Sequence, residues 1–536
     1  MELRSILLRA LLPALSLIVL PVFGALAQSP FRATVESGEV AGSIEDGVLV
    51  FKGIPYAAPP MGELRWRAPR PPAAWPGVRD AFEFGSACPQ APSKDVHLAE
   101  MSEDCLTLNI WSPARHRGAH LPVMVWLHGG AFTSGSARVR IYDGGNIARK
   151  DVVMVTINYR LGVFGFFGHP QLTAEARAEG VPTANYGLLD QIEALRWVKR
   201  NIEAFGGDPS NVTLFGESAG GISVLALMTS PMAGGLFQKA IIQSGGGRWV
   251  APSLTTKTAN FAAAYDYGEK GARAFGLRPE AAIAGLRSKG WEDIRDTVGT
   301  IPELADVTPF IDGELLTGQI EEVFSRGEEA PVPIIVGANS YEGVLLRKSF
   351  HARTNDVLGE VKPRLSALTF LYPPQLIMTP DFLADHIWGD ANFVEPARMI
   401  ARDVSRNGQS VFHYAFDFQP PLLRLIGGSP HGLEVAYALG NLQRVVPFPL
   451  SALMHPHNRE VSRLMVSYWT NFAKTGDPNG AGVIDWPRFA TGDEETLVFG
   501  NDGLSIERDY LKERLDLVRS QSGDSFSPRG QHTSLP

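Results

Sequence analysis

Short apolar runs alternate with amphipathic stretches along the middle of this 536-residue chain. Val123–Leu127 and Asp151–Ile157 are nearly continuous apolar runs with many β-branched residues, a pattern typical of strands that are buried on both faces. The other strand candidates share this character; they are Val212–Phe215, Lys239–Gln243, Pro333–Val336, Val411–Phe416 and Thr496–Phe499. We therefore predict a sheet that is covered by helices on both sides.

Helical periodicity is clearest between the second run and residue 206. Leu188, Ile192, Leu195, Val198 and Ile202 fall on one face of a helix predicted over Tyr186–Phe205, and Gly206-Gly207 should end it. Strands that alternate with such helices predict an α/β domain with a mostly parallel sheet. Residues 345–410 are less regular, and we expect a helical insertion there rather than a separate domain.

Composition narrows the class of protein. The chain is 44% hydrophobic and 20% charged, with a net charge of −8 and a pI near 5.9. This ordinary globular balance gives no sign of nucleic acid or an anionic membrane surface as a partner. The Ser, Gly and Pro content of residues 521–536 predicts a disordered tail.

The first 27 residues have the pattern of a cleaved signal peptide. A short basic region containing Arg4 and Arg9 precedes the apolar stretch Leu11–Ala25, and Ala25-Leu26-Ala27 is a small-x-small cleavage site. We expect a mature chain that starts at Gln28 and is exported, either periplasmic or secreted; the alternative is an uncleaved membrane anchor. No later stretch approaches the ~20 apolar residues of a spanning helix, so no membrane insertion is expected after cleavage.

Cys88 and Cys105 are the two cysteines of the chain. In an exported protein this number suggests one disulfide, with two buried free thiols as the alternative. A metal site would need more Cys or clustered His, so no metal is expected.

Gly216-Glu217-Ser218-Ala219-Gly220 is a G-x-S-x-G motif between a predicted strand and the helix-prone stretch Ala219–Met228. A serine at such a turn is exposed on a sharp, strained corner and can act as a nucleophile. The alternative is an ordinary Gly-rich turn. The context favours Ser218 as the nucleophile.

A serine nucleophile needs a base, and the base needs an acid that orients it. Among 12 histidines, His431 stands out on a Gly/Pro-flanked loop after the strand Val411–Phe416; His169, His413 and His351 remain competitors. Glu342 is the first carboxylate after Pro333–Val336 and fits the chain order Ser…Asp/Glu…His. From the residues alone, a solvated loop glutamate is an equal alternative for Glu342.

The segment His128-Gly129-Gly130-Ala131-Phe132 follows the strand Val123–Leu127. Small residues at this position let backbone N–H groups face a cavity and stabilise an oxyanion. We predict Gly130, Ala131 and Ala219 as the donors, with His128 in a structural role.

These motifs together resemble the type-B carboxylesterase family. Phe205–Gly220 is similar to the family's serine signature, and Glu103–Ile110 to its second signature, with Thr107 in place of a common aromatic residue. Further similarities run from Gly53 to Pro487; they include Cys88-Pro89-Gln90, Gly62–Trp66, Asn158–Arg160, Gly187–Gln191, Gly337–Gly343 and His431–Glu434.

The resemblance implies a single α/β-hydrolase domain over residues 28–520 and a serine esterase that acts on small-molecule esters without a cofactor. It implies Glu342 as the acid, His431 as the base and a Cys88–Cys105 bond. Two buried ion pairs are also implied, Arg65 with Glu103 and Arg160 with Asp190.

Alternatives to this function are a lipase or an amidase on the same triad, or a non-catalytic adhesion protein of the same fold. No lid and no choline site are evident in the sequence, and the oligomeric state is open. Arg138 and Arg140, just past the oxyanion loop, could bind a substrate carboxylate together with Arg248; the alternative is solvated surface arginines.

Overall fold

The computed structural model describes most of the chain from residue 31 onward. The described residues are 31–113, 116, 118–182, 184–248, 251–258, 262–301, 304, 307–344, 370–372, 380–420, 427–445 and 456–521. From Phe31 the chain forms one compact unit. The predicted signal peptide, the competitor His351 and the tail beyond residue 521 lie outside the described residues. Within the described ranges, no helix is both long and apolar enough to cross a membrane.

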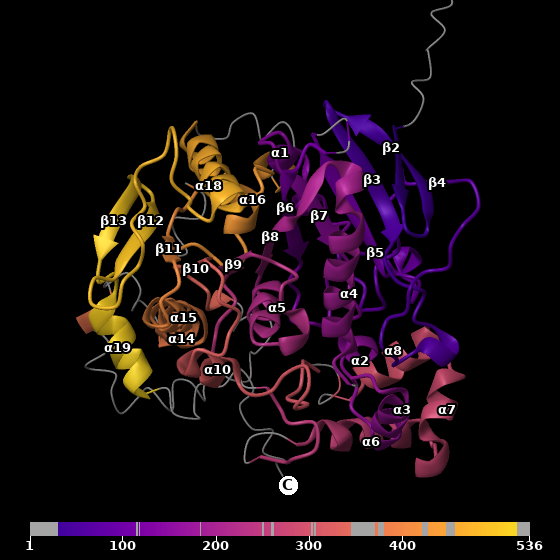
Figure 1. The fold of residues 1–536 in the computed structure, drawn as a ribbon. Helices are drawn as coiled ribbons and strands as arrows, with labels where there is room; N and C mark the ends of the chain where they lie inside the picture. The colour runs from indigo at the N-terminus through magenta and orange to yellow at the C-terminus, as the bar shows by residue number, and fades with distance from the viewer. Residues whose placement is uncertain are drawn as a thin grey trace, which may run out of the picture. The chain divides into compact units, whose positions relative to one another are not determined.

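A single mixed sheet runs through this unit. Over the described residues its strand order is β1-β2-β3-β5-β7-β6-β8-β9-β10-β11-β12-β13, with β4 paired to β2. The indigo N-terminal strands form one edge and the yellow β12 and β13 form the other (Figure 1). The strands are β1 Phe31–Val35, β2 Gly38–Glu45, β3 Val48–Pro55, β4 Val78–Asp80, β5 Thr107–Ser112, β6 Leu121–Leu127, β7 Val153–Ile157, β8 Gly207–Glu217, β9 Lys239–Gln243, β10 Ile334–Asn339, β11 Val411–Phe416, β12 Glu495–Gly500 and β13 Gly503–Arg508.

The centre of the sheet, from β7 to β12, is parallel, whereas the pairs at both edges are antiparallel except for β4 with β2. Alternate residues of the central strands enter two different cores. In β6, Val123, Val125 and Leu127 belong to the core formed with α4 (Tyr186–Asn201), α5 (Ala219–Met228) and α15 (Glu395–Arg406). Met124 and Trp126 belong to the core formed with α16 (Glu434–Ala438) and α18 (Pro456–Thr475). Burial on both faces explains why these strands are mostly apolar rather than alternating between apolar and polar residues.

Helices cover both faces of the sheet: α4, α5 and α15 pack on one face, and α16 and α18 pack on the other (Figure 1). The α-helices are α1 Gly145–Ala148, α2 Gly162–Gly165, α3 Pro170–Glu179, α4 Tyr186–Asn201, α5 Ala219–Met228, α6 Ala264–Ala274, α7 Ala282–Arg287, α8 Trp291–Gly299, α10 Ile320–Arg326, α14 Pro380–Gly389, α15 Glu395–Arg406, α16 Glu434–Ala438, α17 Leu442–Val445, α18 Pro456–Thr475 and α19 Lys512–Gln521. Short 3₁₀ turns occupy η1 Gly62–Leu64, η2 Leu98–Glu100, η3 Arg140–Tyr142, η4 Ile202–Phe205, η5 Pro231–Ala233 and η6 Pro279–Ala281, and η10 Asp390–Val394 is a π-helix.

The strands and helices predicted by residue range are all present, and most of them begin or end a few residues away from the predicted bounds. The predicted helix Tyr186–Phe205 divides into α4 and the 3₁₀ turn η4, and Gly206 ends it with a φ of 82°. The strand predicted at Pro333–Val336 continues to Asn339, because β10 stays paired with β11. Gly337 is therefore a packing residue: a Cβ there would lie 2.3 Å from the carbonyl oxygen of Tyr414.

The region predicted as helical insertions, residues 345–410, is described over 370–372 and 380–410. There α14, η10 and α15 follow one another without a break. Ala397, Ile400 and Val404 of α15 belong to the same core as Ile334 of β10, so α15 is a helix that covers the sheet rather than an addition to it.

Candidate active site

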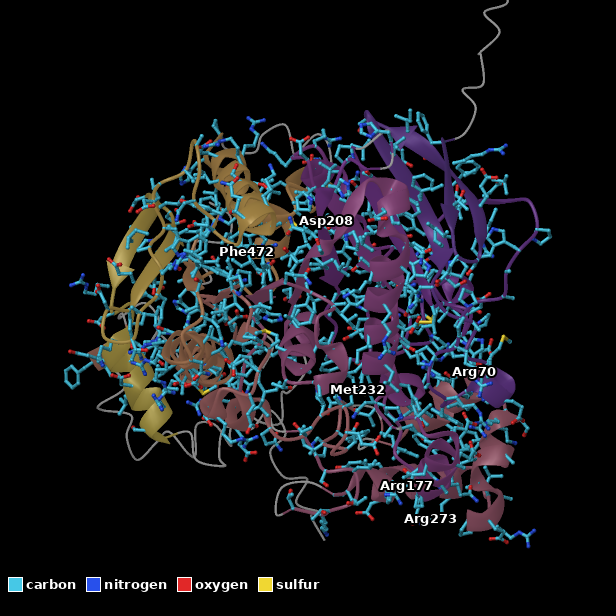
Figure 2. The ribbon with its side chains drawn as sticks, in the orientation of Figure 1. Arg70, Arg177, Asp208, Met232, Arg273 and Phe472 are labelled. Carbon is cyan, nitrogen blue, oxygen red and sulfur yellow. A yellow bond between two sulfur atoms is a disulfide. The ribbon has the colours of Figure 1, made fainter. Side chains whose placement is uncertain are left out.

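Ser218 lies at the turn between β8 and α5. Its backbone has φ 56° and ψ −125°, a combination that costs free energy for any residue with a Cβ and is retained where function requires it. Its N–H donates to the carbonyl oxygen of Gln243 at 3.0 Å, which fixes the turn to the end of β9. In Figure 2, Asp208 is labelled at the start of β8 and Met232 is labelled just past the end of α5. The turn that carries Ser218 lies between these two residues in the sequence.

The glycines of the G-x-S-x-G motif are required because the turn that carries Ser218 closely contacts the end of β6. A Cβ at Gly220 would lie 2.0 Å from the carbonyl oxygen of Leu127, and one at Gly216 would lie 2.6 Å from the carbonyl carbon of Gly220. No side chain fits at either distance. The G-x-S-x-G pattern therefore records the packing of the serine turn against the neighbouring strand.

The predicted oxyanion loop follows β6 and contacts this turn. A Cβ at Gly129 would lie 3.0 Å from the Cβ of Ser218, and Gly130 has a φ of 115°. Among the described residues, the N–H groups of Gly130, Ala131 and Ala219 have no protein acceptor. The chain thus leaves three backbone donors free beside the serine, as an oxyanion hole requires.

Glu342 lies in the loop after β10 and is 1% exposed. One carboxylate oxygen accepts hydrogen bonds from the Ser244 hydroxyl at 2.6 Å and from the Asn339 N–H at 2.7 Å. The other oxygen accepts from Nδ1 of His431 in a short hydrogen bond. Both carboxylate oxygens of Glu342 are therefore hydrogen-bonded, and one of them orients the imidazole of His431.

His431 contacts both the loop that carries Glu342 and the turn that carries Ser218. Its Nδ1 binds Glu342, and its Nε2 lies 3.0 Å from Oε1 of Glu217, the residue directly before Ser218, without the alignment of a hydrogen bond. The ring of Phe393 packs against the imidazole at 5.1 Å between centroids. The second ring nitrogen therefore faces the serine turn.

Burial and negative charge act in opposite directions on this histidine. Burial by itself lowers the pKa of His431, but the carboxylates of Glu342 and Glu217 outweigh it and raise the pKa to about 9. Burial also raises the pKa of Glu217 to about 7, although the charge of His431 opposes this rise. The protonation of the base is consequently coupled to that of its neighbours.

Glu434 adds a third buried carboxyl group at this place and is 0% exposed. It accepts hydrogen bonds from Nδ2 of Asn339 and from Nε2 of Gln243, the latter at 3.3 Å. Burial and the charge of Glu217 raise the pKa of Glu434 to about 8. The raised pKa values of Glu217 and Glu434 favour their protonated forms, which limits the negative charge around the imidazole.

Sequence reasoning did not identify Glu217, Glu434 or Phe393 as members of the site. Glu217 occupies a variable position of the motif, and Phe393 is far from His431 in the sequence. A carboxylate inside an otherwise apolar strand end was a usable signal for Glu217, because a buried charge needs a partner.

The competing histidines have other surroundings. His413 is buried in β11 with Nδ1 2.9 Å from the Thr496 hydroxyl, and burial lowers its pKa to about 3. His169 caps α3 by accepting from the Gln171 N–H at 3.2 Å. His128 is buried against the ring of Tyr159, and burial lowers its pKa to about 4. These contacts are those of packing residues.

Two of the three arginines considered for substrate binding already contact carboxylates of the chain. Arg248 donates to Glu395 and Glu321, and Arg138 donates to Glu100 at 2.7 Å. Arg140 is exposed at the start of η3.

The covalent and ionic links implied by the family resemblance are present. Cys88 and Cys105 form a disulfide. Arg65 donates to Glu103, and Arg160 to Asp190, in each case through two guanidinium nitrogens at 2.6–2.7 Å.

Comparisons with known proteins identify the family of this chain. The model of the carboxylesterase family matches residues 29–367 and 383–518. The chain is 35% identical over 516 residues to a para-nitrobenzyl esterase of Bacillus subtilis (strain 168), covering 92% of this chain and 99% of that protein. It is 34% identical over 496 residues to a fumonisin B1 esterase of Sphingopyxis macrogoltabida, covering 88% and 87%.

Solved structures that resemble the chain belong to the same family of esterases. A carboxylesterase of Geobacillus stearothermophilus superposes with a TM-score of 0.79 at 33% identity, covering 92% of this chain and all 100% of that one. A para-nitrobenzyl esterase superposes with a TM-score of 0.74 at 34% identity, covering 91% and 99%. The chain therefore belongs to the carboxylesterase family, has the α/β-hydrolase fold and is a carboxylic ester hydrolase.

Proposed function

We propose that this hydrolase cleaves small-molecule esters through an acyl-enzyme on Ser218, with His431 as general base and acid and Glu342 as the residue that orients it. The observation that carries the proposal is the position of the His431 ring. Its Nδ1 is bound by the buried carboxylate of Glu342. Its Nε2 lies 3.0 Å from the side chain of Glu217, which directly precedes Ser218 on its strained turn. This is the arrangement of groups that activates a serine hydroxyl.

In the first half of the reaction, Oγ of Ser218 attacks the ester carbonyl carbon, and its proton passes to Nε2 of His431. The N–H groups of Gly130, Ala131 and Ala219 donate to the carbonyl oxygen as it becomes negative. When the C–O bond to the alcohol breaks, His431 returns the proton to the departing oxygen. In the second half, water loses a proton to Nε2 and attacks the acyl carbon, and Ser218 leaves with that proton.

Replacement of the nucleophile tests this proposal. Ser218→Ala should lower kcat by roughly 10⁴-fold or more while the circular dichroism spectrum stays the same, because the covalent step is lost. A fluorophosphonate should label the wild type at one site and leave Ser218→Ala unlabelled. Ser223→Ala is the matched control and should be labelled normally. Ser223 is a buried serine of α5 whose hydroxyl accepts a hydrogen bond from Gln191 of α4. Equal labelling of Ser218→Ala would refute the assignment.

An anionic substrate group is a further part of this proposal. Arg138 and Arg248 are already bound to carboxylates of the chain, so Arg140 is the best placed of the three to meet a substrate carboxylate. A charge-assisted pair of roughly 1.5–3 kcal/mol would favour an anionic ester about 10–150-fold in kcat/KM over a neutral ester of equal size. Arg140→Ala should abolish that preference. Equal kcat/KM for both esters in the wild type would exclude it.

Export completes the proposal. The disulfide between Cys88 and Cys105 supports an oxidising compartment. Mass spectrometry of the protein from its native host should give a mature N-terminus at Gln28. An intact Met1 on the mature protein would contradict cleavage.

A further inference from the structure

One short stretch of helix contacts both the acid loop and the base. The π-helical turn η10, Asp390–Val394, joins α14 to α15. Its Phe393 packs against the His431 ring at 5.1 Å with an angle of 56° between the rings. Directly before η10, at the last residue of α14, a Cβ at Gly389 would lie 3.1 Å from the Cβ of Glu342. The stretch therefore borders both members of the proposed acid–base pair.

A π-helical turn is rare because its hydrogen bonds are poorly placed, so it persists only where neighbouring groups hold it. Here two ion pairs hold its ends. Asp390 is bound by two guanidinium nitrogens of Arg514 at 2.6 and 2.7 Å. Glu395, the first residue after the turn, is bound by two guanidinium nitrogens of Arg248 at 2.6 and 3.1 Å. The side chains of Asp390 and Glu395 are 2% and 1% exposed.

Arg248 belongs to the loop that follows β9, and this loop is itself part of the site. Ser244 in the same loop donates to Glu342 at 2.6 Å. The loop also packs directly on the π-helical stretch: a Cβ at Gly246 would lie 3.0 Å from the Asn392 carbonyl oxygen, and one at Gly247 would lie 3.2 Å from that of Pro396. The Arg248–Glu395 pair thus closes a ring of contacts that runs from Glu342 through the loop and η10 to His431.

We infer that Arg248 is a positioning residue for ester hydrolysis: its ion pair with Glu395 fixes η10 so that Phe393 holds the His431 ring facing Ser218. The inference rests on the proposed function, since it takes His431 as the base. Proton transfer from Ser218 depends on the direction of Nε2, and a shift of about 1 Å in a reacting group can lower the rate roughly 10²-fold. An aromatic wall that also excludes water from the imidazole serves the same step.

The test uses a variant that removes the ion pair without leaving one buried charge. Arg248→Gln/Glu395→Gln keeps groups of similar length that can hydrogen-bond to each other. On a neutral ester we expect kcat to fall roughly 10–100-fold with KM within about 2-fold, because alignment is lost and binding is not. Arg248→Lys should give an intermediate kcat, since a lysine keeps the charge but lacks the planar fork that meets both carboxylate oxygens.

Arg402→Gln is the matched control. Arg402 lies on α15, is 16% exposed against 15% for Arg248, and is paired with Glu494 away from the site. Its replacement should leave kcat unchanged. If the double variant does not fold, the comparison of Arg248→Lys with Arg402→Lys decides the question, and equal kcat in these two would overturn the inference.

A double-mutant cycle with Phe393→Ala separates positioning from a general loss of structure. In the Phe393→Ala background, the Arg248→Gln/Glu395→Gln change should alter kcat by less than about 2-fold, because the ring through which Arg248 acts is gone. A full additional fall in that background, an unchanged kcat in the wild-type background, or a loss confined to anionic esters would each overturn the inference. Ser218→Ala is assayed alongside: activity in that variant would refute the acyl-enzyme mechanism itself, whereas an inactive Ser218→Ala with a fully active Arg248 series removes only the positioning role.

Discussion

Nε2 of His431 lies 3.0 Å from Oε1 of Glu217, so the base meets a carboxyl group of the residue that directly precedes the proposed nucleophile. Glu217 is 6% exposed, and a Cβ at Gly432, next to the histidine, would lie 3.3 Å from the same oxygen. The contact links the loop after β11 to the end of β8. It also means that the charge of Glu217 bears directly on whether His431 is free to accept a proton.

The first prediction concerns the pH dependence of kcat/KM. Hydrolysis needs a neutral His431, whose pKa is raised to about 9 by Glu342 and Glu217 against the effect of burial. Activity should therefore rise with pH through the alkaline range as the imidazole loses its proton. Glu217→Gln removes a negative charge that stabilises the imidazolium, so it should move this rise to lower pH. The measurement is the pH profile of kcat/KM for both proteins between about pH 5 and 10. A shift of the rise in kcat/KM to higher pH in Glu217→Gln would contradict the prediction.

A second prediction concerns the acid. Glu342→Gln should lower kcat roughly 10⁴-fold, as expected when the acid of a catalytic triad becomes an amide and no longer holds the productive tautomer of the histidine. The amide oxygen can still accept from Ser244 and Asn339, so the melting temperature should change little. If activity stays within about tenfold of the wild type, Glu217 or Glu434 orients the base instead.

The third prediction concerns the disulfide. Cys88 and Cys105 are 17 positions apart, and opening a loop of this size should lower the free energy of unfolding by about 3 kcal/mol in the chain-entropy account. Urea denaturation of Cys88→Ala/Cys105→Ala against the wild type measures this difference. Two thiols titrated in the denatured, unreduced wild type would show that the bond is absent from the purified protein.

Buried and exposed ion pairs should differ in their effect on stability. Arg160 and Asp190 are 2% and 0% exposed, and burial raises the pKa of Asp190 even though Arg160 opposes the rise. Arg160→Met strands a buried carboxylate and should cost about 3–5 kcal/mol of unfolding free energy. Arg70→Met breaks a pair in which the arginine is 53% exposed and should cost less than about 1 kcal/mol. Similar losses in both variants, measured by urea denaturation, would count against this difference.

The sequence by itself determined the central strands and the serine turn. Strands β9 and β11 and helix α5 have the predicted bounds. A parallel strand buried on both faces is mostly apolar and is followed by polar or glycine residues, so its sequence stands out. The turn at Ser218 could be located because Gly216 and Gly220 are sterically required there. Such features depend on neighbours in the chain and on one adjacent strand, so local patterns record them.

The surroundings of the site were decided only by the tertiary structure. Glu217 and Phe393 contact His431 from two distant segments, and each has an ordinary interpretation in its own segment. Arg248 shows the limit most clearly: beside a catalytic loop it suggested a carboxylate on a substrate, whereas the folded chain supplies the carboxylate of Glu395. A guanidinium binds whichever carboxylate the fold places within about 3 Å, and that choice is made by packing between distant segments.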